Sequence, residues 1–150
     1  MKTPKAPLRV LLTDDDEDDR LIFKEILDEM DKDIIVRMVN DGKQLMDFLA
    51  TENKPLPHII FLDLNMPTMN GLECLKEIRN DDRYSDISIA IYSTSISEKD
   101  IEETFLHGAN IYITKPAAYS ELKKVLKKSL TAVRMNLNSE LDRSNFVLKI

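Results

Sequence analysis

The sequence has little cysteine and no long apolar run, which are the features typical of secreted proteins, membrane proteins and proteins stabilised by a structural metal. It has a single cysteine, Cys74, which cannot form an internal disulfide and has no histidine or cysteine near it at metal-ligand spacing. No apolar run approaches the roughly 20 residues that a membrane-spanning helix needs, and no apolar signal core follows the first residues, Met1 to Lys5. We therefore expect a protein of the reducing cytoplasm that does not enter a membrane.

Charge and glycine content exclude further classes. The formal net charge is −6, whereas a protein that holds nucleic acid by itself neutralises phosphates with clustered Lys and Arg. The chain has no glycine-rich loop of the kind that holds a nucleotide. At 150 residues, 43% of them hydrophobic, it can bury a core without disulfides or a structural metal. We predict one domain over residues 1–150, with its core at about 7–132 and a C-terminal tail at 133–150, that binds no nucleic acid.

Short apolar runs alternate with amphipathic ones along the chain. The run Ile59 to Leu62 is too short for a helix and is typical of a strand that is buried on both faces. The predicted strands span residues 8–13, 34–39, 59–62, 87–92 and 111–114, and apolar residues recur at helical spacing after each of them. The fourth helix should begin at a capping box, Ser97 to Asp100, and run through Phe105, with Gly108 as its stop signal.

This alternation of strand and helix determines the predicted fold. Parallel strands need crossover connections, and those connections are right-handed. We predict an α/β, flavodoxin-like, doubly wound fold: a five-stranded parallel sheet in the order 2-1-3-4-5 with helices on both faces.

Polar side chains follow four of the five predicted strands. They are Asp14 and Asp15 after the first, Asp63 after the third, Ser93 and Thr94 after the fourth, and Lys115 after the fifth. Because ligands of open parallel sheets bind at the carboxyl ends of the strands, we expect these side chains to meet at one edge. Crowded carboxylates favour a hard divalent cation such as Mg²⁺. A carboxylate can also act as a nucleophile toward a phosphoryl group, with a metal, a lysine and hydroxyls balancing the charge.

Each of these residues, taken alone, also has a purely structural interpretation. Acidic residues are favoured at helix N-termini by the macrodipole, and we assign Asp16 to Asp19 to that role. Asp63 could form a turn after its strand, and Lys115, before Pro116, could be a surface lysine. The coincidence of all of them at one sheet edge favours a functional site.

Four segments together resemble the receiver domain of two-component response regulators. They are Leu11-Leu12-Thr13-Asp14-Asp15-Asp16, Leu62-Asp63-Leu64-Asn65-Met66-Pro67-Thr68-Met69-Asn70-Gly71, Tyr92-Ser93-Thr94-Ser95 and Tyr112-Ile113-Thr114-Lys115-Pro116. This combination is far more specific than any one of its parts. The segment Ser93 to Ile96 and the long loop Thr51 to Pro57 are similar, within that family, to single-domain regulators that serve phytochrome-type kinases.

The resemblance implies a phosphoacceptor and its metal. Asp63 would accept a phosphoryl group from the phosphohistidine of a sensor histidine kinase or a histidine phosphotransfer protein. Asp14, Asp15 and Asp63, with the backbone carbonyl of Asn65, would hold Mg²⁺.

The resemblance also implies a switch. Ser93, Thr94 and Lys115 would contact the phosphoryl group. The Ser93 hydroxyl would move toward it and Tyr112 would rotate inward, which changes the face made by the fourth helix, fifth strand and fifth helix. A downstream protein target would bind that face. The Lys115-Pro116 bond would be cis, as in relatives.

Three classes of function are compatible with the predicted fold. A phosphorylatable switch is preferred. An adaptor of the same fold that ignores phosphate would lack one of Asp15, Asp63 or Lys115, and all three are present. A phosphohydrolase acting on separate substrates would need a general acid two residues after the nucleophile, and Asn65 there cannot donate a proton in that way. We predict a receiver that is not an enzyme and that only dephosphorylates itself slowly.

The tail after the fifth predicted helix has an apolar end. About twenty residues remain there, too few to fold alone, and we therefore expect a stand-alone receiver. The apolar residues Phe146, Val147, Leu148 and Ile150 can pack on the domain or on a second copy in a homodimer, and a frayed terminus is the alternative.

Overall fold

The strands and helices alternate along the whole domain, as predicted. The structure, a computed structural model, describes residues 7–31, 33–51, 54–135 and 146–148. Its strands are β1 (Leu8–Thr13), β2 (Ile34–Val39), β3 (Ile59–Leu62), β4 (Ser88–Ser93) and β5 (Ile111–Thr114). Its helices are α1 (Glu17–Met30), α2 (Gly42–Ala50), α3 (Gly71–Arg79), α4 (Glu98–Leu106) and α5 (Tyr119–Arg134), with a short 3-10 helix at Asp82–Tyr84.

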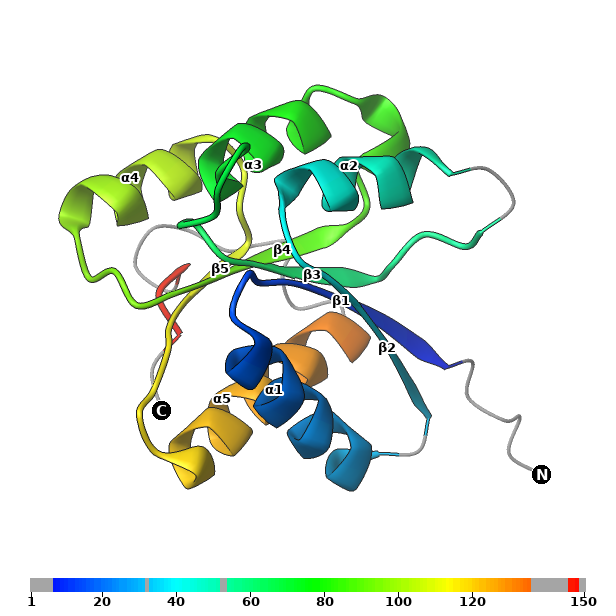
Figure 1. Cartoon of the computed structure of the whole chain (residues 1–150), viewed down its shortest axis with the longest axis vertical. Coiled ribbons are helices and arrows are strands. Elements are labelled where there is room, and N and C mark those ends of the chain that lie inside the picture. Colours follow the sequence, from blue (N-terminus) through cyan, green and yellow to red (C-terminus); the bar gives the residue numbers. More distant parts are fainter. Residues whose placement is uncertain (1–6, 32, 52–53, 136–145, 149–150) are drawn as a thin grey trace.

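The five strands form one parallel sheet in the order β2-β1-β3-β4-β5, which confirms the predicted fold. Figure 1 shows α2, α3 and α4 on one face of the sheet and α1 and α5 on the other. In register, Thr13 pairs with Leu62, and Ser93 pairs with Thr114. The residues that follow β1, β3 and β5 therefore leave the sheet at the same edge, where β4 also ends.

The core has two parts, one on each face of the sheet. Strand β3 is buried along its whole length because helices cover both of its faces. Its residues alternate between the two parts: Ile60 and Leu62 pack with α2 and α3, whereas Ile59 and Phe61 pack with α1 and α5. The continuous apolar run that predicted this strand thus reflects burial on both sides.

Strand β4 begins one residue later than predicted. The Ile87 amide donates a hydrogen bond to the carbonyl of Tyr84 and so closes a turn, whereas the Ser88 amide donates to His58 and begins the sheet pairing. The shift makes Ser93, which is buried, the last residue of the strand.

Helix capping differs from the prediction at α4. The Ser97 hydroxyl accepts a hydrogen bond from the Asp100 amide, but the Asp100 carboxylate accepts the Ser95 hydroxyl over 2.6 Å. A complete capping box lies instead at α3, where the side chains of Asn70 and Glu73 each accept the other residue's amide.

None of the helices within the described part of the chain is long and apolar enough to cross a membrane.

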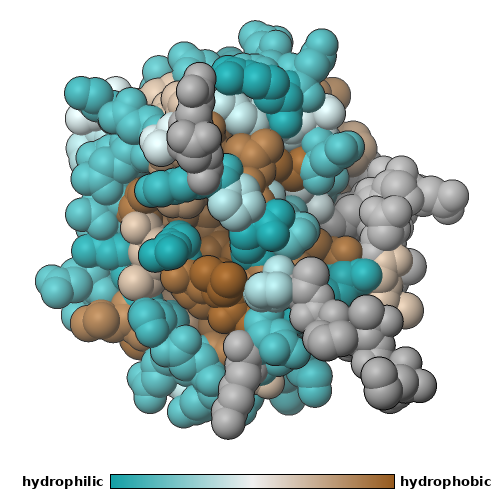
Figure 2. Space-filling view, turned by 90° about the vertical axis from the view of Figure 1, so that its right-hand side faces the viewer, coloured by the Kyte–Doolittle hydropathy of each residue, from teal (hydrophilic) through white to brown (hydrophobic). Residues whose placement is uncertain are grey.

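Exposed apolar surface occurs at the β2 edge, where Ile35 is 41% exposed and a cavity of about 260 Å³ is lined by Ile35, Phe48 and Pro57. Figure 2 shows this side of the molecule, with hydrophobic surface gathered inside a hydrophilic rim. The β2 edge is the opposite edge of the sheet from β5.

Candidate functional site

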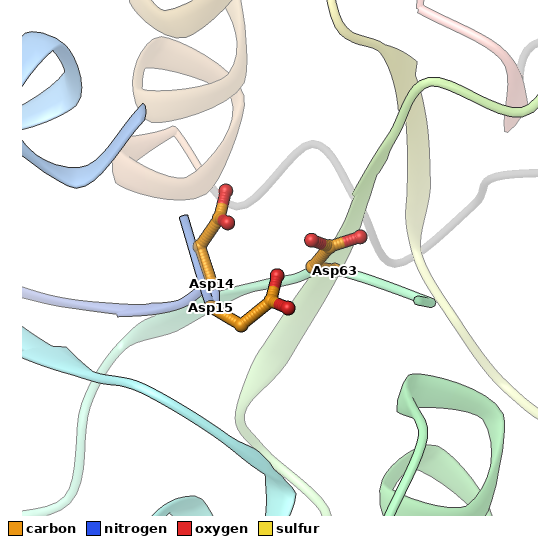
Figure 3. A group of neighbouring side chains, drawn as sticks. All are labelled: Asp14, Asp15 and Asp63. Carbon is orange, nitrogen blue, oxygen red and sulfur yellow. The ribbon is translucent and has the colours of Figure 1, made fainter. Parts of the chain in front are cut away.

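Three carboxylates meet where β1 and β3 end. Asp14 and Asp15 follow β1 directly, and Asp63 follows β3. One carboxylate oxygen from each lies within 4.8 Å of the others (Figure 3). Asp14 and Asp63 are buried, whereas Asp15 is exposed. The structure thus brings together the three acidic side chains that the sequence analysis selected.

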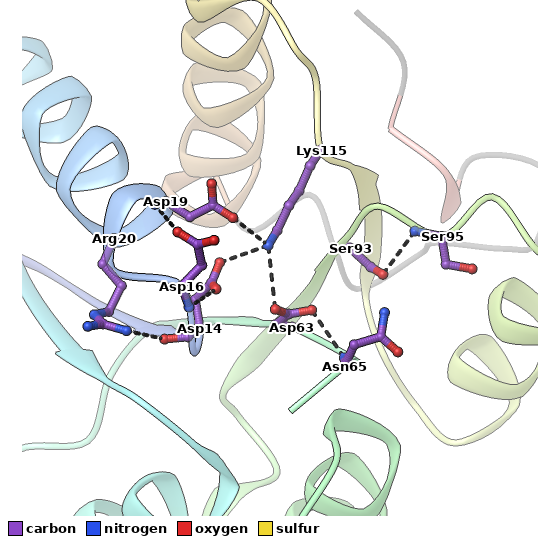
Figure 4. A network of polar contacts seen from close by, with 9 residues as sticks. All are labelled: Asp14, Asp16, Asp19, Arg20, Asp63, Asn65, Ser93, Ser95 and Lys115. Atoms are coloured by element: carbon purple, nitrogen blue, oxygen red, sulfur yellow. Dashed lines mark hydrogen bonds and ion pairs between the residues drawn. The ribbon is translucent and has the colours of Figure 1, made fainter. Parts of the chain in front are cut away.

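Lys115, at the end of β5, points its ammonium into this cluster. Its Nζ atom lies 2.9 Å from the Asp14 carboxylate, 3.0 Å from Asp19 and 3.4 Å from Asp63 (Figure 4). Its side chain is only 11% exposed, so it is not a surface lysine. Its backbone amide donates to the Ser93 carbonyl over 2.8 Å, which continues the pairing of β5 with β4 and fixes where the side chain starts.

Asp19 is a member of the site that the sequence analysis missed. We had assigned Asp16 to Asp19 to the helix N-terminus. Asp16 does cap α1, since its carboxylate accepts the Asp19 amide over 3.0 Å. The Asp19 side chain, however, reaches back to Lys115. Side chains on a helix lean toward its N-terminus. Asp19 is the third residue of a helix that starts beside the end of β1, so its position in the sequence could have indicated a place in the site.

The Asp14 carboxylate is held on both sides. One oxygen accepts the Asp16 amide over 3.0 Å and the other accepts Lys115. The backbone carbonyl of Asp14 accepts the Arg20 guanidinium over 2.9 Å. These bonds fix the β1–α1 turn and with it the position of one wall of the site.

Asp63 is positioned by the loop that leads into α3. Its amide donates to the Thr13 carbonyl, which extends the pairing with β1, and its carboxylate accepts the Asn65 amide over 3.2 Å. Helix α3 begins so close to this loop that a Cβ on Gly71 would lie 2.2 Å from the Asp63 carbonyl oxygen. Only glycine allows this approach.

Burial changes the electrostatics of the cluster. Burial raises the pKa of the Asp63 carboxyl to about 6; Lys115 and the Asn65 amide oppose the shift, and the nearby charge of Asp14 adds to it. Burial alone would lower the pKa of Lys115, but its hydrogen bonds to Asp14 and Asp19 and the charge of Asp63 hold that pKa above its usual range. Lys115 therefore stays charged while Asp63 ionises with difficulty.

The donor set fits a divalent cation. Asp14, Asp15, Asp19 and Asp63 set four carboxylates against the single ammonium of Lys115. Burial disfavours the ionised form of Asp63, and a cation among Asp14, Asp15 and Asp63 would favour it. The ligands are all hard oxygens, which Mg²⁺ prefers.

At the end of β4, Ser93 faces the site and the next residue, Thr94, faces solvent. Ser93 is buried at the same sheet edge, and its hydroxyl accepts the Ser95 amide over 3.1 Å (Figure 4). Thr94 is exposed. Tyr112 on β5 is buried, and its hydroxyl donates to the Ser95 carbonyl over 2.9 Å. Ser95 thus bonds both residues to which the sequence analysis gave a switching role.

One prediction at this edge is wrong. The peptide bonds of the described residues are all trans, the Lys115-Pro116 bond included. The trans form is ordinarily favoured before proline by about 0.5–1 kcal/mol, and in this form Lys115 already reaches three carboxylates.

The fold and the acidic cluster are those of a receiver, and comparison with known proteins establishes the family. A family model described as the response regulator receiver domain matches residues 10–127. The chain belongs to this family of two-component signalling proteins.

Individual relatives agree with this membership. The chain is similar to the response regulator Rcp1 of Synechocystis sp., with 31% identity over 125 residues, which are 81% of this chain and 85% of Rcp1. It is also similar to a chemotaxis protein CheY homolog of Campylobacter jejuni, with 31% identity over 123 residues, 82% of this chain and 92% of the homolog.

Solved structures show the same likeness. The phosphorylated cyanobacterial phytochrome response regulator RcpA matches with a TM-score of 0.81 and 32% identity, over 87% of this chain and 96% of RcpA. The Mn²⁺-bound form of Rcp1 matches with a TM-score of 0.73 and 28% identity, over 91% of this chain and 98% of that one. The predicted likeness to phytochrome-associated regulators is confirmed.

Proposed function

We propose that this receiver accepts a phosphoryl group on Asp63 from a phosphohistidine and passes the signal on by a change of conformation. The observation that carries the proposal is the position of Asp63: a buried carboxylate with the Lys115 ammonium at 3.4 Å and the exposed Asp15 beside it. In this arrangement an Asp63 oxygen attacks phosphorus, the P–N bond to the donor histidine breaks, and the imidazole leaves with the electron pair. The product is an acyl phosphate on Asp63.

The site has room for the donor. A hollow of about 410 Å³ is lined by Asp15, Asn65 and Met66 on one side and by Asp100 and Thr104 of α4 on the other. Asp15, a member of the acidic cluster, is part of its lining, and we expect the phosphoryl donor to approach Asp63 from this side.

Mg²⁺ is the proposed cofactor. Asp14, Asp15 and Asp63, with the Asn65 backbone carbonyl, would hold it, and when bound it would neutralise negative charge on the transferring oxygens. The Mn²⁺-bound form of Rcp1 supports a divalent ion in this kind of site. Lys115, which contacts Asp14 and Asp63, contributes the second positive charge.

The switch residues follow from the hydrogen bonds. Ser93, now bonded to the Ser95 amide, would turn its hydroxyl to a phosphoryl oxygen, with Thr94 at the outer side of the same loop. Tyr112 would transmit this movement to the face formed by α4, β5 and α5 through its bond to Ser95. A downstream protein target would read that face.

The phosphodonor would be a sensor histidine kinase or a histidine phosphotransfer protein in the cytoplasm. Exposed apolar side chains flank the Lys115 side of the site: Ile22 on α1 is 39% exposed and Tyr119 on α5 is 42% exposed. Both line a cavity of about 280 Å³, together with Lys115 and Pro116. Such a surface suits docking of a partner protein next to the phosphoacceptor.

The experiment is phosphorylation by acetyl phosphate with Mg²⁺, followed by intact mass. The wild type should gain the mass of one phosphoryl group, Asp63→Asn should not, and Asp18→Asn, an exposed carboxylate in the first turn of α1, should behave as the wild type. A gain that persists in Asp63→Asn would place the acceptor elsewhere. No gain in any of the three proteins would favour the alternative, an adaptor of the same fold that does not depend on phosphorylation.

The proposal also includes slow loss of the phosphoryl group by self-directed hydrolysis. Asn65 offers no proton to an external leaving group, so no turnover of separate phosphate esters is expected. The mass of the isolated phosphoprotein, followed over time, tests the slow self-directed hydrolysis. Release of inorganic phosphate from added esters tests for turnover of separate substrates.

A further inference from the structure

The outer edge of β5 is occupied by the described C-terminal segment, residues 146–148. Strand β5 is last in the sheet order, and such an edge presents unpaired backbone groups. Here Val147 forms a parallel bridge with Tyr112, and the Leu148 amide donates to the Tyr112 carbonyl over 2.9 Å. Figure 1 shows this segment, in red, beside β5. Of the apolar tail residues that the sequence analysis selected, Ile150 lies outside the described residues.

The side chain of Phe146 anchors this segment. Phe146 is fully buried, and its ring centroid lies 5.2 Å from that of Phe105 on α4 and 6.0 Å from that of Tyr112, both in edge-on arrangement. Edge-on aromatic pairs at these separations are favourable beyond the area that they bury. The segment 146–148 therefore binds the same tyrosine twice, by its ring and by its backbone.

Tyr112 connects this segment to the phosphoacceptor site. Its hydroxyl donates to the Ser95 carbonyl, and the Ser95 amide donates to the hydroxyl of Ser93. A continuous series of contacts thus runs from Phe146 through Tyr112 and Ser95 to Ser93, at the sheet edge that holds Asp63.

We propose that the edge of β5 is a docking site for the chain's own segment Phe146 to Leu148, and that docking of this segment and phosphorylation of Asp63 favour each other. The second half rests on the proposed function. With the segment docked, Phe146 closes the space behind the Tyr112 ring, so the ring is held inward with its hydroxyl on Ser95. That is also the position from which Tyr112 supports Ser95 when the Ser93 hydroxyl turns to a phosphoryl oxygen.

Thermodynamic linkage makes the proposal quantitative. If a phosphoryl group at Asp63 tightens docking of the segment by some factor, the docked segment must tighten binding of a phosphoryl analogue by the same factor. Beryllium trifluoride with Mg²⁺ is a suitable probe because it mimics a phosphoryl group on a carboxylate without a covalent bond, so that its binding can be measured at equilibrium.

The first measurement is the exchange rate of the Leu148 amide hydrogen in the full chain, by NMR. We expect exchange to slow by about fivefold or more when beryllium trifluoride and Mg²⁺ are added, the lower end of ordinary allosteric coupling. If the analogue binds at Asp63 and the exchange rate of the Leu148 amide does not change, the inference is wrong. If exchange becomes faster, docking and phosphorylation oppose each other, which also contradicts the proposal. Protection that grows with protein concentration would assign the segment to a second copy instead.

The second measurement is the affinity for the analogue in variants. Phe146→Ala should weaken binding by the factor found for exchange. Leu148→Pro, which removes the amide donor to Tyr112 and restricts the backbone of the segment, should weaken it as well. Phe146→Leu should restore part of the loss. Leu49→Ala, which opens a cavity elsewhere in the same part of the core, should lower stability without this loss. If Leu49→Ala and Phe146→Ala lose the same affinity for the analogue, the effect is general destabilisation and the proposed coupling is wrong.

These results separate the two proposals. If intact mass shows no phosphorylation of Asp63 and the analogue does not bind, the proposed function fails and the coupling fails with it. If Asp63 is phosphorylated while Leu148 exchange and the Phe146→Ala affinity stay at their reference values, the proposed function stands and only the coupling is wrong.

Discussion

The ammonium of Lys115 lies 2.9 Å from the carboxylate of Asp14, a residue 101 positions earlier in the chain, and is closer to it than to Asp63 at 3.4 Å. Lys115 is thus paired most closely with a buried acid next to the phosphoacceptor. A cation bound at the proposed site would share the neutralisation of Asp14.

Replacing Lys115 should be costly to the fold. In Lys115→Met the fully buried Asp14 loses its cation, and removal of one partner of a buried pair costs about 3–5 kcal/mol. We expect a fall of this order in the free energy of unfolding without Mg²⁺, measured by urea titration, and a smaller fall with Mg²⁺. Lys24→Met breaks an exposed pair with Asp28 and should cost less than about 1 kcal/mol. Similar losses in the two variants would contradict this reading of the cluster.

The stability of the protein should depend on the ionisation of Asp63. Its pKa rises from an ordinary 3.8 to about 6 on folding. Between these values the folded state keeps a proton that the unfolded state has released, so this group's contribution to stability is lost as pH rises from about 4 to about 6.

Asp63→Asn cannot ionise and should escape this loss. Above pH 6 and without Mg²⁺ it should be more stable than the wild type by on the order of 3 kcal/mol, and below about pH 4 the two should differ little. Urea titrations of both proteins across this range give the difference directly. A difference that does not vary with pH would mean that Asp63 ionises normally.

Mg²⁺ should stabilise the folded protein in proportion to its binding. A ligand at a hundred times its Kd adds about 2.7 kcal/mol, so the urea midpoint should rise with Mg²⁺ concentration. Asp15→Asn replaces one carboxylate oxygen of the proposed site by an amide nitrogen and removes its charge, so it should shift that rise to higher Mg²⁺. Asp18→Asn removes the same charge nearby and should not. If both variants respond equally, the effect is general charge screening.

Gly71 should be irreplaceable for the site, in contrast to Gly108. A Cβ at position 71 would lie 2.2 Å from the Asp63 carbonyl oxygen, so Gly71→Ala must displace the loop that carries the phosphoacceptor. We expect a stability loss of about 1–3 kcal/mol or more and much slower phosphorylation of Asp63. Gly108 has a φ of +95° far from the site, so Gly108→Ala should cost about 1–2 kcal/mol in backbone strain. Its phosphorylation rate, followed by intact mass, should stay near that of the wild type.

Much of the fold was readable from local patterns. Ile59 to Leu62 is apolar throughout because helices cover both faces of β3, and the breaks at Met66-Pro67 and Asn70 come where the loop and the α3 cap lie. The strand boundary at Ser88 was missed by one residue, because it depends on a hydrogen bond to His58 that no local pattern contains.

The sequence by itself determined the architecture and the set of acids, lysine and hydroxyl at the strand ends, because the periodicity of burial and the polar residues that end each strand are properties of consecutive residues. Tertiary structure alone decided that Asp19 turns back onto Lys115 and that Phe146 closes over Tyr112. Each of these depends on contacts between segments that are distant in the chain, and the free energy of such contacts is set by packing and burial in three dimensions.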